Sequence, residues 1–548
     1  MAIVQTPQYW IKNIAVIGMV AILAACGGGG GGNSSSDSGN GGGSGSVTPP
    51  PVELDVTPDN FVFEAKNDAM PGETYTSNTI TVSGINAAVP VSITGGEYAI
   101  DNGDFTSAAT IVSAGQTIVV RAMAAPTPDS IIDVVLTIGG VKGTYSIITP
   151  VDEAAPTAEF MFPPPVSMTD GATVLVRGVA SDDYSKITAV TVNGKDVRPT
   201  GENFATWEVE VPLEPGNNKL VVETTDAAEN TSPNAAEVMV HRGAIKEAFP
   251  DAENEFSGVV DLVIDRLDGR NRLITIGGET SEVISVDLST GERSPFIIPH
   301  PFESGVNAIW GIALDEQTKE IFFRDTTEGG ILAQPLDKGT SRFKFNKMLS
   351  GGWVCTVDNI DEEPKIVMAG GSDNMDIVVT NSDFSEFTRL SPATEGAENL
   401  LGESYGMTLD RVNGRYLVTD FSNQRIIAVD RTTGTQSIFS SNDVGIGDSF
   451  GDENDPIGGI AVDEENLRVI VAEVVSGKLF SIDLANGNRT LLSGPDIPNS
   501  DVILRETYGV KINTPASYAF VADHGLNGVV AVDLVTGHRV VFSKSKNY

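Results

Sequence analysis

Cysteine, histidine and basic residues are scarce in this sequence of 548 residues. Only two cysteines, Cys26 and Cys355, and four histidines occur, which excludes a disulfide framework and zinc sites built from repeated Cys/His pairs. Lysine and arginine total 35 against 74 acidic residues, so the formal net charge is −39. Nucleic acids are bound by clusters of basic side chains that release counterions. No such cluster occurs here, so we expect no nucleic-acid partner.

The sequence contains one long apolar run, residues 14–25, which follows Lys12. These twelve residues are too few to span a bilayer core of about 30 Å, so they predict the core of a signal peptide. The segment Leu23-Ala24-Ala25-Cys26 resembles the lipobox of bacterial lipoprotein signal peptides. The resemblance implies a signal peptide over residues 1–25 and membrane anchoring through a lipidated Cys26. An ordinary secretory signal with an incidental cysteine is the alternative.

A flexible linker is predicted over residues 26–51. It consists almost entirely of Gly, Ser and Asn and ends in three prolines. A Gly/Ser chain of about 25 residues has a root-mean-square reach of about 25–30 Å, which would hold a folded body above a membrane. Gly27 stands where an Asp would favour retention in the inner membrane of enteric bacteria. We therefore expect an outer-membrane lipoprotein, either periplasmic or exposed at the cell surface.

Residues 52–150 read as short strands separated by turns. The alternating or β-branched segments are residues 79–82, 91–93, 117–121 and 133–138, and Gly-rich or Asn-Gly turns lie between them. This pattern predicts a β-sandwich domain. Residues 77–84 resemble a β-sandwich module of bacterial surface proteins.

Residues 151–243 contain a series of phrases that resemble one bacterial domain type. The phrases are residues 155–157, 176–183, 190–194, 212–222 and 225–230. They resemble the bacterial immunoglobulin-like domain that occurs beside glucodextranase-type catalytic units, which implies a second β-sandwich that acts as a spacer. The carboxylates of Asp182, Asp183 and Asp226 either bind calcium at a domain junction or accept hydrogen bonds from nearby turns; both interpretations stay open.

The last 300 residues repeat. An apolar strand that ends in an acid or amide recurs every 43 to 53 residues, at residues 260–265, 310–315, 353–358, 405–410, 458–463 and 508–513. Further strands follow each copy, and several third strands lead into a Gly turn and an arginine. A period of this length with about four strands per unit predicts propeller blades, which bury their faces only against neighbouring blades. We expect an all-β chain: two β-sandwiches followed by a six-bladed β-propeller over residues 244–548.

These repeats resemble the six-bladed propellers of the gluconolactonase and senescence-marker family and, more loosely, NHL-type and TolB-like repeats. The resemblance implies an axial Ca²⁺ held by a Glu, an Asn and an Asp, and a calcium-dependent lactonase or esterase activity. The positions that correspond to the Asn and the Asp read Tyr405-Gly406 and Pro456-Ile457-Gly458 here, and Ser257-Gly258 does not reproduce the Glu motif. The match therefore favours the fold and disfavours the catalysis.

A binding face is predicted where the inner strands begin and the second strands end, because both lie around one mouth of a propeller. Four inner strands begin with an aromatic residue, and four second strands end in an acid. Aromatic rings mixed with carboxylates suit carbohydrates, and they also suit a cation. Packing between blades and capping of turns is the alternative. The candidate residues are Trp310, Trp353, Tyr405, Tyr508, Asp325, Asp420, Glu473 and Asp523.

Two further patterns occur in the sequence. The Gly-x-Ser-x-Gly matches at residues 402–406 and 447–451 lack the following helix that a hydrolase nucleophile elbow requires, so we assign no catalytic residue. The acidic loop at residues 448–455 could hold Ca²⁺ as the one possible cofactor, although its spacing differs from an EF-hand. Its candidate ligands are Asp448, Asp452, Glu453 and Asp455.

Together these features predict a lipid-anchored, non-enzymatic envelope protein whose propeller binds a carbohydrate or protein partner. A calcium-dependent hydrolase with rearranged ligands and a structural subunit of an envelope assembly are the alternatives.

Overall fold

The computed structural model describes residues 53–546 except 251–253, 279–281, 297–308, 327–328, 338, 347–351, 371–375, 392–398 and 496–501. Cys26, the signal peptide and the whole linker lie outside the described residues. The described part of the chain is all-β: it contains no α-helix, and its three short 3₁₀ turns are η1 (Glu202–Phe204), η2 (Leu267–Gly269) and η4 (Thr514–Ala516). Within these residues, no helix has the length and apolarity to cross a membrane.

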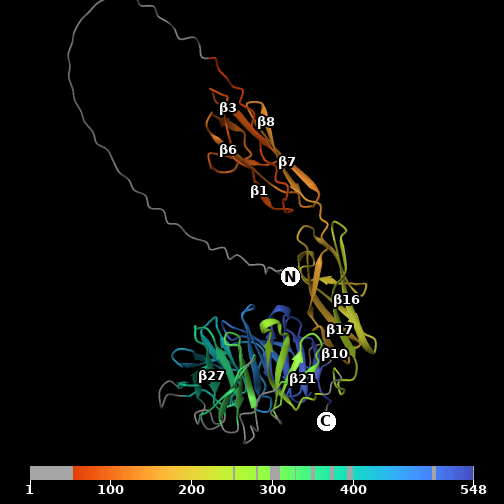
Figure 1. Cartoon of the computed structure of the whole chain (residues 1–548), viewed down its shortest axis with the longest axis vertical. Helices are drawn as coiled ribbons and strands as arrows, with labels where there is room; N and C mark the ends of the chain where they lie inside the picture. The colour runs from red at the N-terminus through yellow and green to blue at the C-terminus, as the bar shows by residue number, and fades with distance from the viewer. Residues whose placement is uncertain are drawn as a thin grey trace, which may run out of the picture. The chain divides into compact units, whose positions relative to one another are not determined.

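Residues 56–149 form the first module, which consists of two four-stranded sheets around one core (Figure 1). Alternation along the strands builds this core, since Val134, Leu136 and Ile138 point inward on one strand and pack with Tyr98 and Ile118. One sheet contains β1 (Thr74–Thr76), β6 (Thr117–Met123), β2 (Ile80–Thr81) and β4 (Glu97–Ile100). The other contains β5 (Thr110–Val112), β3 (Val89–Thr94), β7 (Ser130–Ile138) and β8 (Val141–Thr149).

Residues 157–242 form the second module, whose sheets enclose Trp207 and Phe162. One sheet contains β14 (Arg198–Pro199), β15 (Trp207–Pro212), β11 (Thr173–Ser181) and β9 (Thr157–Phe162). The other contains β13 (Lys195–Asp196), β12 (Ile187–Val192), β16 (Gly216–Asp226), β17 (Thr231–Arg242) and β10 (Val166–Thr169).

The second sheet of this module continues into the last sheet of the chain. Strand β10 pairs in parallel with β17 and antiparallel with β41 (Arg539–Lys544), where Met168 lies opposite Val541. A buried ion pair between Arg177 and Asp533, at 2.5 Å, lies at the same junction. The second module and the C-terminal sheets therefore share one hydrophobic core.

Residues 259–544 contain six four-stranded antiparallel units, each of consecutive strands. The first three units are β18 (Val259–Asp265), β19 (Arg272–Gly277), β20 (Val283–Asp287), β21 (Arg293–Pro295); β22 (Ile309–Asp315), β23 (Glu320–Asp325), β24 (Gly330–Pro335), β25 (Arg342–Phe345); and β26 (Val354–Asp358), β27 (Lys365–Ala369), β28 (Ile377–Asn381), β29 (Phe387–Ser391). The last three are β30 (Met407–Asp410), β31 (Arg415–Asp420), β32 (Arg425–Asp430), β33 (Gln436–Ser441); β34 (Ile457–Asp463), β35 (Arg468–Glu473), β36 (Leu479–Asp483), β37 (Arg489–Ser493); and β38 (Thr507–Asn513), β39 (Tyr518–Asp523), β40 (Gly528–Asp533), β41.

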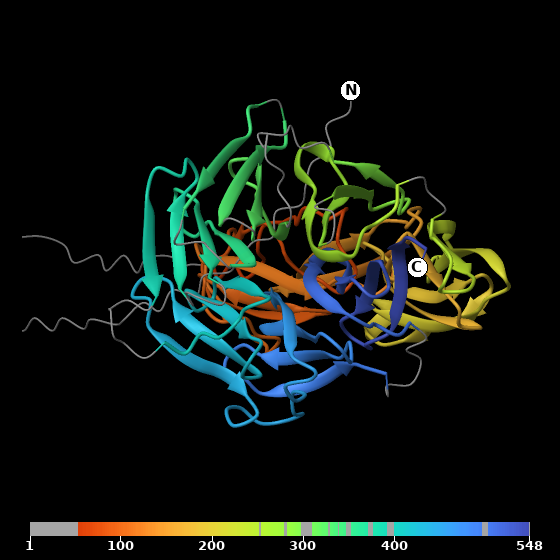
Figure 2. The same cartoon turned by 90° about the horizontal axis from the view of Figure 1, so that it is seen from below.

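These units close a ring, so the C-terminal part is a β-propeller (Figure 2). Each first strand of a unit (β18, β22, β26, β30, β34, β38) contacts the first strand of the next, and β38 contacts β18. Side-chain hydrogen bonds also join the last unit to the first. Ser543 Oγ donates to Gly291 O, and Arg293 Nη1 donates to Ser543 Oγ. The same pair of hydrogen bonds joins the last two units, because Ser493 Oγ donates to Gly537 O and Arg539 Nε donates to Ser493 Oγ. The Gly-x-Arg turns of the repeat therefore hold neighbouring units together.

Candidate functional site

Glycines in the inner strands let these strands approach one another closely around the propeller axis. A Cβ atom on Gly459 would lie 2.0 Å from the carbonyl oxygen of Tyr508, and one on Gly406 would lie 2.5 Å from that of Gly458. A Cβ on Gly311 would similarly lie 2.6 Å from Trp353 O. Each clash is with the backbone of the next inner strand, so these positions require glycine. The glycines bring the residues beside them to the axis.

Four aromatic side chains at the starts of inner strands meet at one end of this axis. The ring centroids of Trp353 and Tyr405 lie 4.1 Å apart, and those of Trp310 and Trp353 lie 5.3 Å apart. Tyr508 completes the group, with its ring 5.8 Å from both Trp310 and Tyr405. All four side chains are half-buried. We refer to Trp310, Trp353, Tyr405 and Tyr508 as the axial aromatic cluster; the sequence register predicted its members.

Two neighbours of the cluster were not predicted. The ring of Phe421 lies 4.5 Å from that of Tyr405, and the ring of His524 lies 6.2 Å from that of Tyr508. His524 Nδ1 lies 2.7 Å from a carboxylate oxygen of Glu506. A signal for both was present, because each directly follows the acid that ends a second strand.

The cluster presents uncharged groups. Burial raises the pKa of the Tyr405 phenol, and the nearby Tyr508 and Glu403 raise it further. Burial likewise raises the pKa of Tyr508, with an additional contribution from Glu506. Both phenols therefore keep their protons at neutral pH and can donate hydrogen bonds. Apolar ring faces next to neutral hydroxyl groups suit a ligand that is itself uncharged and rich in hydroxyls.

The four predicted acids are buried at the ends of the second strands. Three of them, Asp420, Glu473 and Asp523, accept hydrogen bonds from nearby groups of the protein. Asp420 accepts hydrogen bonds from the Asn423 side chain and from Arg425 Nε at 2.8 Å. Glu473 accepts from the backbone N–H of Gly451 and from the hydroxyl of Ser476.

Asp523 is held in a similar way, because its carboxylate accepts from the backbone N–H groups of Arg505 and Leu526, both at 2.7 Å. Asp325 ends β23 and is 7% exposed. In the part of the chain that the structure describes, no three of these four acids bring ligand oxygens within 4.8 Å of one another. The structure therefore groups the aromatic half of the predicted face and leaves the acids separate.

A local motif explains Asp420. The spacing Asp-x-x-Asn-x-Arg occurs at Asp420 and again at Asp410 and Asp463. In each copy the aspartate accepts from the Asn side chain and from the Arg Nε, and so fixes the turn between two strands. This spacing was the available signal for a structural role.

The acids of the loop at residues 448–455 also bond to nearby backbone. Asp448 accepts from the N–H of Leu491, and Asp455 accepts from those of Val475 and Ser476. Asp452 accepts from Asn454, and Glu453 is exposed. No three of these four acids, all of which are described, share a space within 4.8 Å. Calcium at this loop stays a prediction without geometric support.

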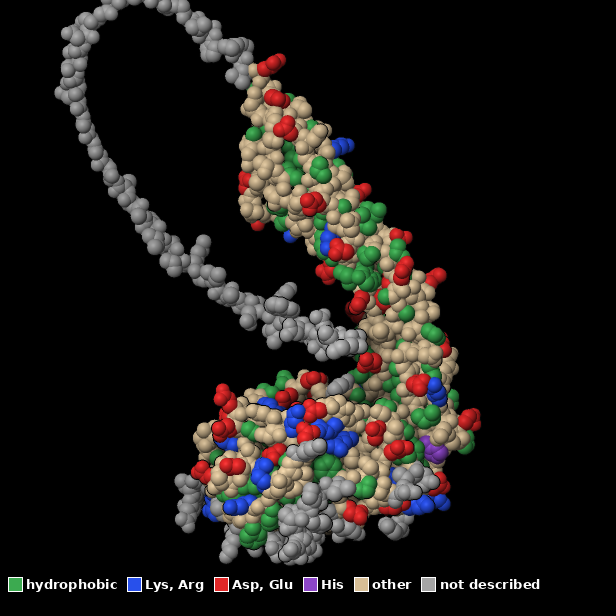
Figure 3. Space-filling model, viewed as in Figure 1, with side chains coloured by type: hydrophobic (Ala, Val, Ile, Leu, Met, Phe, Trp, Pro, Cys, Tyr) green, Lys and Arg blue, Asp and Glu red, His purple; other side chains and the backbone are tan. Residues whose placement is uncertain are grey.

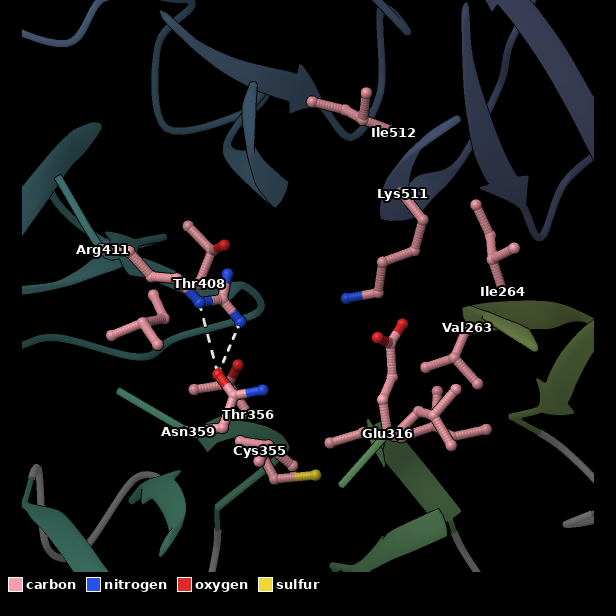
Figure 4. Close-up of a pocket in the computed structure, with 15 residues that line it drawn as sticks. Val263, Ile264, Glu316, Cys355, Thr356, Asn359, Thr408, Arg411, Lys511 and Ile512 are labelled. Atoms are coloured by element: carbon pink, nitrogen blue, oxygen red, sulfur yellow. Dashed lines mark hydrogen bonds between the residues drawn. The ribbon is translucent and has the colours of Figure 1, made fainter. Parts of the chain in front are cut away.

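The opposite end of the axis holds a polar cavity of about 240 Å³. It is lined by residues of five inner strands and by residues just after three of them, Glu316, Asn359 and Arg411, whereas the aromatic cluster stands at strand starts. In Figure 4 the ammonium group of Lys511 and the carboxylate of Glu316 point toward one another across the cavity. Arg411 donates two hydrogen bonds to Oδ1 of Asn359, which directly follows β26. Charged side chains therefore face this cavity, whereas uncharged aromatic rings meet at the other end.

Two titratable groups lie between the ends. Burial raises the pKa of Asp261, and the positive charge of Lys511 opposes this rise. The Asp261 carboxylate accepts from the N–H groups of Leu262 and Ile312. Burial also raises the pKa of the Cys355 thiol to about 12, so the thiol is neutral and a poor nucleophile. Cys355 is buried and forms no disulfide.

Charges of both signs mix on the propeller surface seen in Figure 3, where Lys and Arg side chains stand among Asp and Glu. Several ion pairs join basic and acidic side chains of the propeller, for example Arg411 with Glu464 at 3.0 Å and Arg342 with Glu320 at 2.6 Å.

No family model and no curated protein matches this chain. Among solved structures, an auxiliary nutrient-binding protein from Bacteroides thetaiotaomicron is 11% identical with a TM-score of 0.42 and covers 71% of this chain and 98% of its own. A nidogen/laminin complex contributes a chain that is 18% identical with a TM-score of 0.38, over 49% of this chain and 91% of that one. A β-propeller domain from Myceliophteria thermophila is 11% identical with a TM-score of 0.37, over 52% and 87%. Similarity at these identities concerns the fold alone.

Proposed function

We propose that this chain is a ligand-binding lipoprotein of the bacterial outer membrane. In this proposal Cys26 carries the lipid, residues 26–51 form the tether, and the two modules are β-sandwich spacers, the second of the immunoglobulin-like type. The propeller, with six blades, presents its axial aromatic cluster to the ligand. The observation that carries the proposal is the convergence of four aromatic side chains from four units on one end of the axis.

The ligand class follows from the chemistry of the cluster. Half-buried indole and phenol rings offer faces on which the apolar side of a sugar ring can stack, and protonated phenols can donate to sugar hydroxyls. The carboxylates of Glu403 and Glu506 lie near the phenols and can accept from such hydroxyls. The net charge of −39 disfavours anionic ligands. We therefore propose a neutral carbohydrate over a protein partner.

Binding without hydrolysis is favoured by the position of the acids. A calcium-dependent lactonase would need carboxylates free to hold an axial ion. Asp420, Glu473 and Asp523 instead accept hydrogen bonds from their own surroundings. The experiment therefore also measures hydrolysis of lactones and esters, which would reveal an enzymatic activity.

The test is a neutral glycan array probed with the full chain, followed by affinity measurements for any glycan retained. Trp353→Ala and Tyr405→Ala should each weaken binding more than tenfold, because each removes a stacking face. Lys511→Met, at the opposite end of the axis, is the matched control and should leave affinity unchanged. An array without binding, or equal losses in the control, would contradict the proposal. Calcium-dependent hydrolysis in a parallel lactone and ester panel would replace it by the hydrolase.

The anchor has its own test. Cells that express the chain should incorporate labelled palmitate into it, and Cys26→Ser should abolish both the label and recovery with outer membranes. Unchanged membrane recovery of Cys26→Ser would contradict lipid anchoring.

A further inference from the structure

We propose that Asp152, Asp182 and Asp226 form a Ca²⁺ site where the connector from the first module enters the second module. Each offers one carboxylate oxygen, and these oxygens all lie within 4.8 Å of one another. Asp152 belongs to the segment between β8 and β9, Asp182 directly follows β11, and Asp226 ends β16. Three separate parts of the chain therefore bring carboxylates to one point, independently of the proposed ligand at the propeller.

The carboxylate of Asp152 has a buried oxygen without a partner, which indicates that a bound ion belongs beside it. Asp152 is 5% exposed, and its Oδ1 accepts from the N–H of Ala154. Its Oδ2 is buried and has no hydrogen-bond partner. A buried charged oxygen without a partner is strongly disfavoured unless a cation or donor reaches it. Among the described residues, no lysine or arginine forms an ion pair with any of the three aspartates, so a bound cation supplies the charge that the protein does not.

The other two carboxylates are oriented by their surroundings. Asp182 Oδ1 accepts from the N–H groups of Tyr184 and Ser185, at 2.9 and 2.6 Å. Asp226 accepts from the N–H and the side-chain amide of Asn230, and the same amide donates to the carbonyl oxygen of Asp152. Such hydrogen bonds from outside the ligand set hold ligands in place before the ion arrives.

The chemistry of the site selects calcium. Carboxylate oxygens are hard ligands, and Ca²⁺ accepts six to eight oxygens, water included, in irregular geometry. Two oxygens bound to one Ca²⁺ at about 2.4 Å each can lie no more than about 4.8 Å apart, which the cluster satisfies. Mg²⁺ requires a nearly regular octahedron and releases its water reluctantly. Three carboxylates completed by water are expected to bind with a Kd of about 10⁻⁴–10⁻³ M, as extracellular modules do.

The site acts on the connection between the modules. Asp152 lies in the segment that links β8 of the first module to β9 of the second, so an ion bound there ties this connector to two turns of the second module. Calcium would then stiffen the spacer. Asp183, although adjacent to Asp182, is not a member of the cluster.

The experiment uses the full chain, stripped with EDTA and titrated with CaCl₂ alone by equilibrium dialysis and thermal unfolding. We expect wild type to bind Ca²⁺ and its unfolding midpoint to rise by about 2–3 °C at 10 mM Ca²⁺. Asp152→Asn and Asp182→Asn should each bind one ion fewer per chain or bind it at least tenfold more weakly. Asp183→Asn is the matched control and should behave as wild type. Asparagine is nearly isosteric with aspartate, and circular dichroism verifies that each variant is folded.

A second readout follows the connector directly. Calcium should slow proteolytic cleavage within residues 150–156 in wild type and in Asp183→Asn, with no effect in Asp152→Asn. The proposal is overturned if wild type binds no Ca²⁺ up to 10 mM, or if Asp152→Asn and Asp182→Asn keep wild-type stoichiometry and affinity. Equal protection by Mg²⁺ would overturn the assignment to calcium. Should either variant fail to fold, protection of wild type at residues 150–156 decides the question alone.

Discussion

The two ends of the propeller axis are built from the same inner strands and yet have opposite chemistry. At the end where the strands begin, four large uncharged rings pack against one another. At the end where they finish, the residues just after the strands are charged or polar, and neighbours bond in pairs, as Arg411 does with Asn359 and Glu464. One repeat therefore places two groups of side chains at the two ends of the same strands.

The shared backbone between the ends is the most sensitive point of the comparison. Gly459→Ala places a Cβ 2.0 Å from the carbonyl oxygen of Tyr508, so the inner strands must separate and both ends should suffer. We expect a loss of about 3 kcal/mol in the free energy of unfolding, measured by urea denaturation. Gly414→Ala in a turn between strands, where the nearest atom is a side-chain carbon at 3.8 Å, should cost only about 1 kcal/mol through its positive φ. Equal losses of unfolding free energy in the two variants would show that the close approach of the inner strands does not require glycine at position 459.

The aromatic end should depend on ring packing. Trp353→Ala removes contacts with Trp310 and Tyr405, and we expect a loss of about 2 kcal/mol together with a weaker near-ultraviolet circular dichroism signal. Trp353→Phe keeps a ring at this position and should lose less than half as much. A stability equal to wild type in Trp353→Ala would mean that the rings are in contact without contributing to stability.

The middle of the axis should respond to pH. Burial raises the pKa of Asp261 above its ordinary value, so the folded state holds this proton more tightly than the unfolded chain. The stability that the protonated carboxyl contributes is therefore complete below about pH 4 and is lost as the pH rises. Asp261→Asn cannot ionise, so its unfolding free energy should improve relative to wild type between pH 4 and pH 7, as measured by urea denaturation. A constant difference across this range would contradict the raised pKa.

The polar end should show the smallest effect. Arg411 and Glu464 are 46% and 39% exposed, and such ion pairs contribute about 0.2–1 kcal/mol. We expect Arg411→Ala and Glu464→Ala to destabilise weakly, and a double-mutant cycle to give a coupling within that range that shrinks in 0.5 M NaCl. A coupling of several kcal/mol would contradict this prediction and show that the ion pair at this end contributes strongly to the free energy of unfolding.

Much of the propeller was predictable because a repeat constrains every unit alike. The aromatic residues of the predicted binding face were chosen from their register, and the structure brings Trp310, Trp353, Tyr405 and Tyr508 together. The acids were assigned to the same face by the same reasoning, but Asp420 points into its own turn and bonds to Asn423 and Arg425. Register shows where a residue stands along a strand, whereas the partner of a side chain depends on nearby groups that register does not include.

The second module shows the same limit. The sequence pointed to Asp182, Asp183 and Asp226 as a group, while the structure replaces Asp183 by Asp152, which lies about 30 residues earlier in the chain. Alternation buries every second residue of a strand, but it gives no information on which connector passes beside which turn.

The sequence by itself determined the all-β character, the repeating units and the aromatic positions of the axis, because periodicity and glycine placement act locally and recur. Only the tertiary structure decided that the acids at the strand ends are internal, that Asp152 joins the aspartate cluster, and that β10 extends the last sheet by pairing with β41. These contacts join residues far apart in the chain, and their free energies depend on distances and burial that exist only once the sheets have packed.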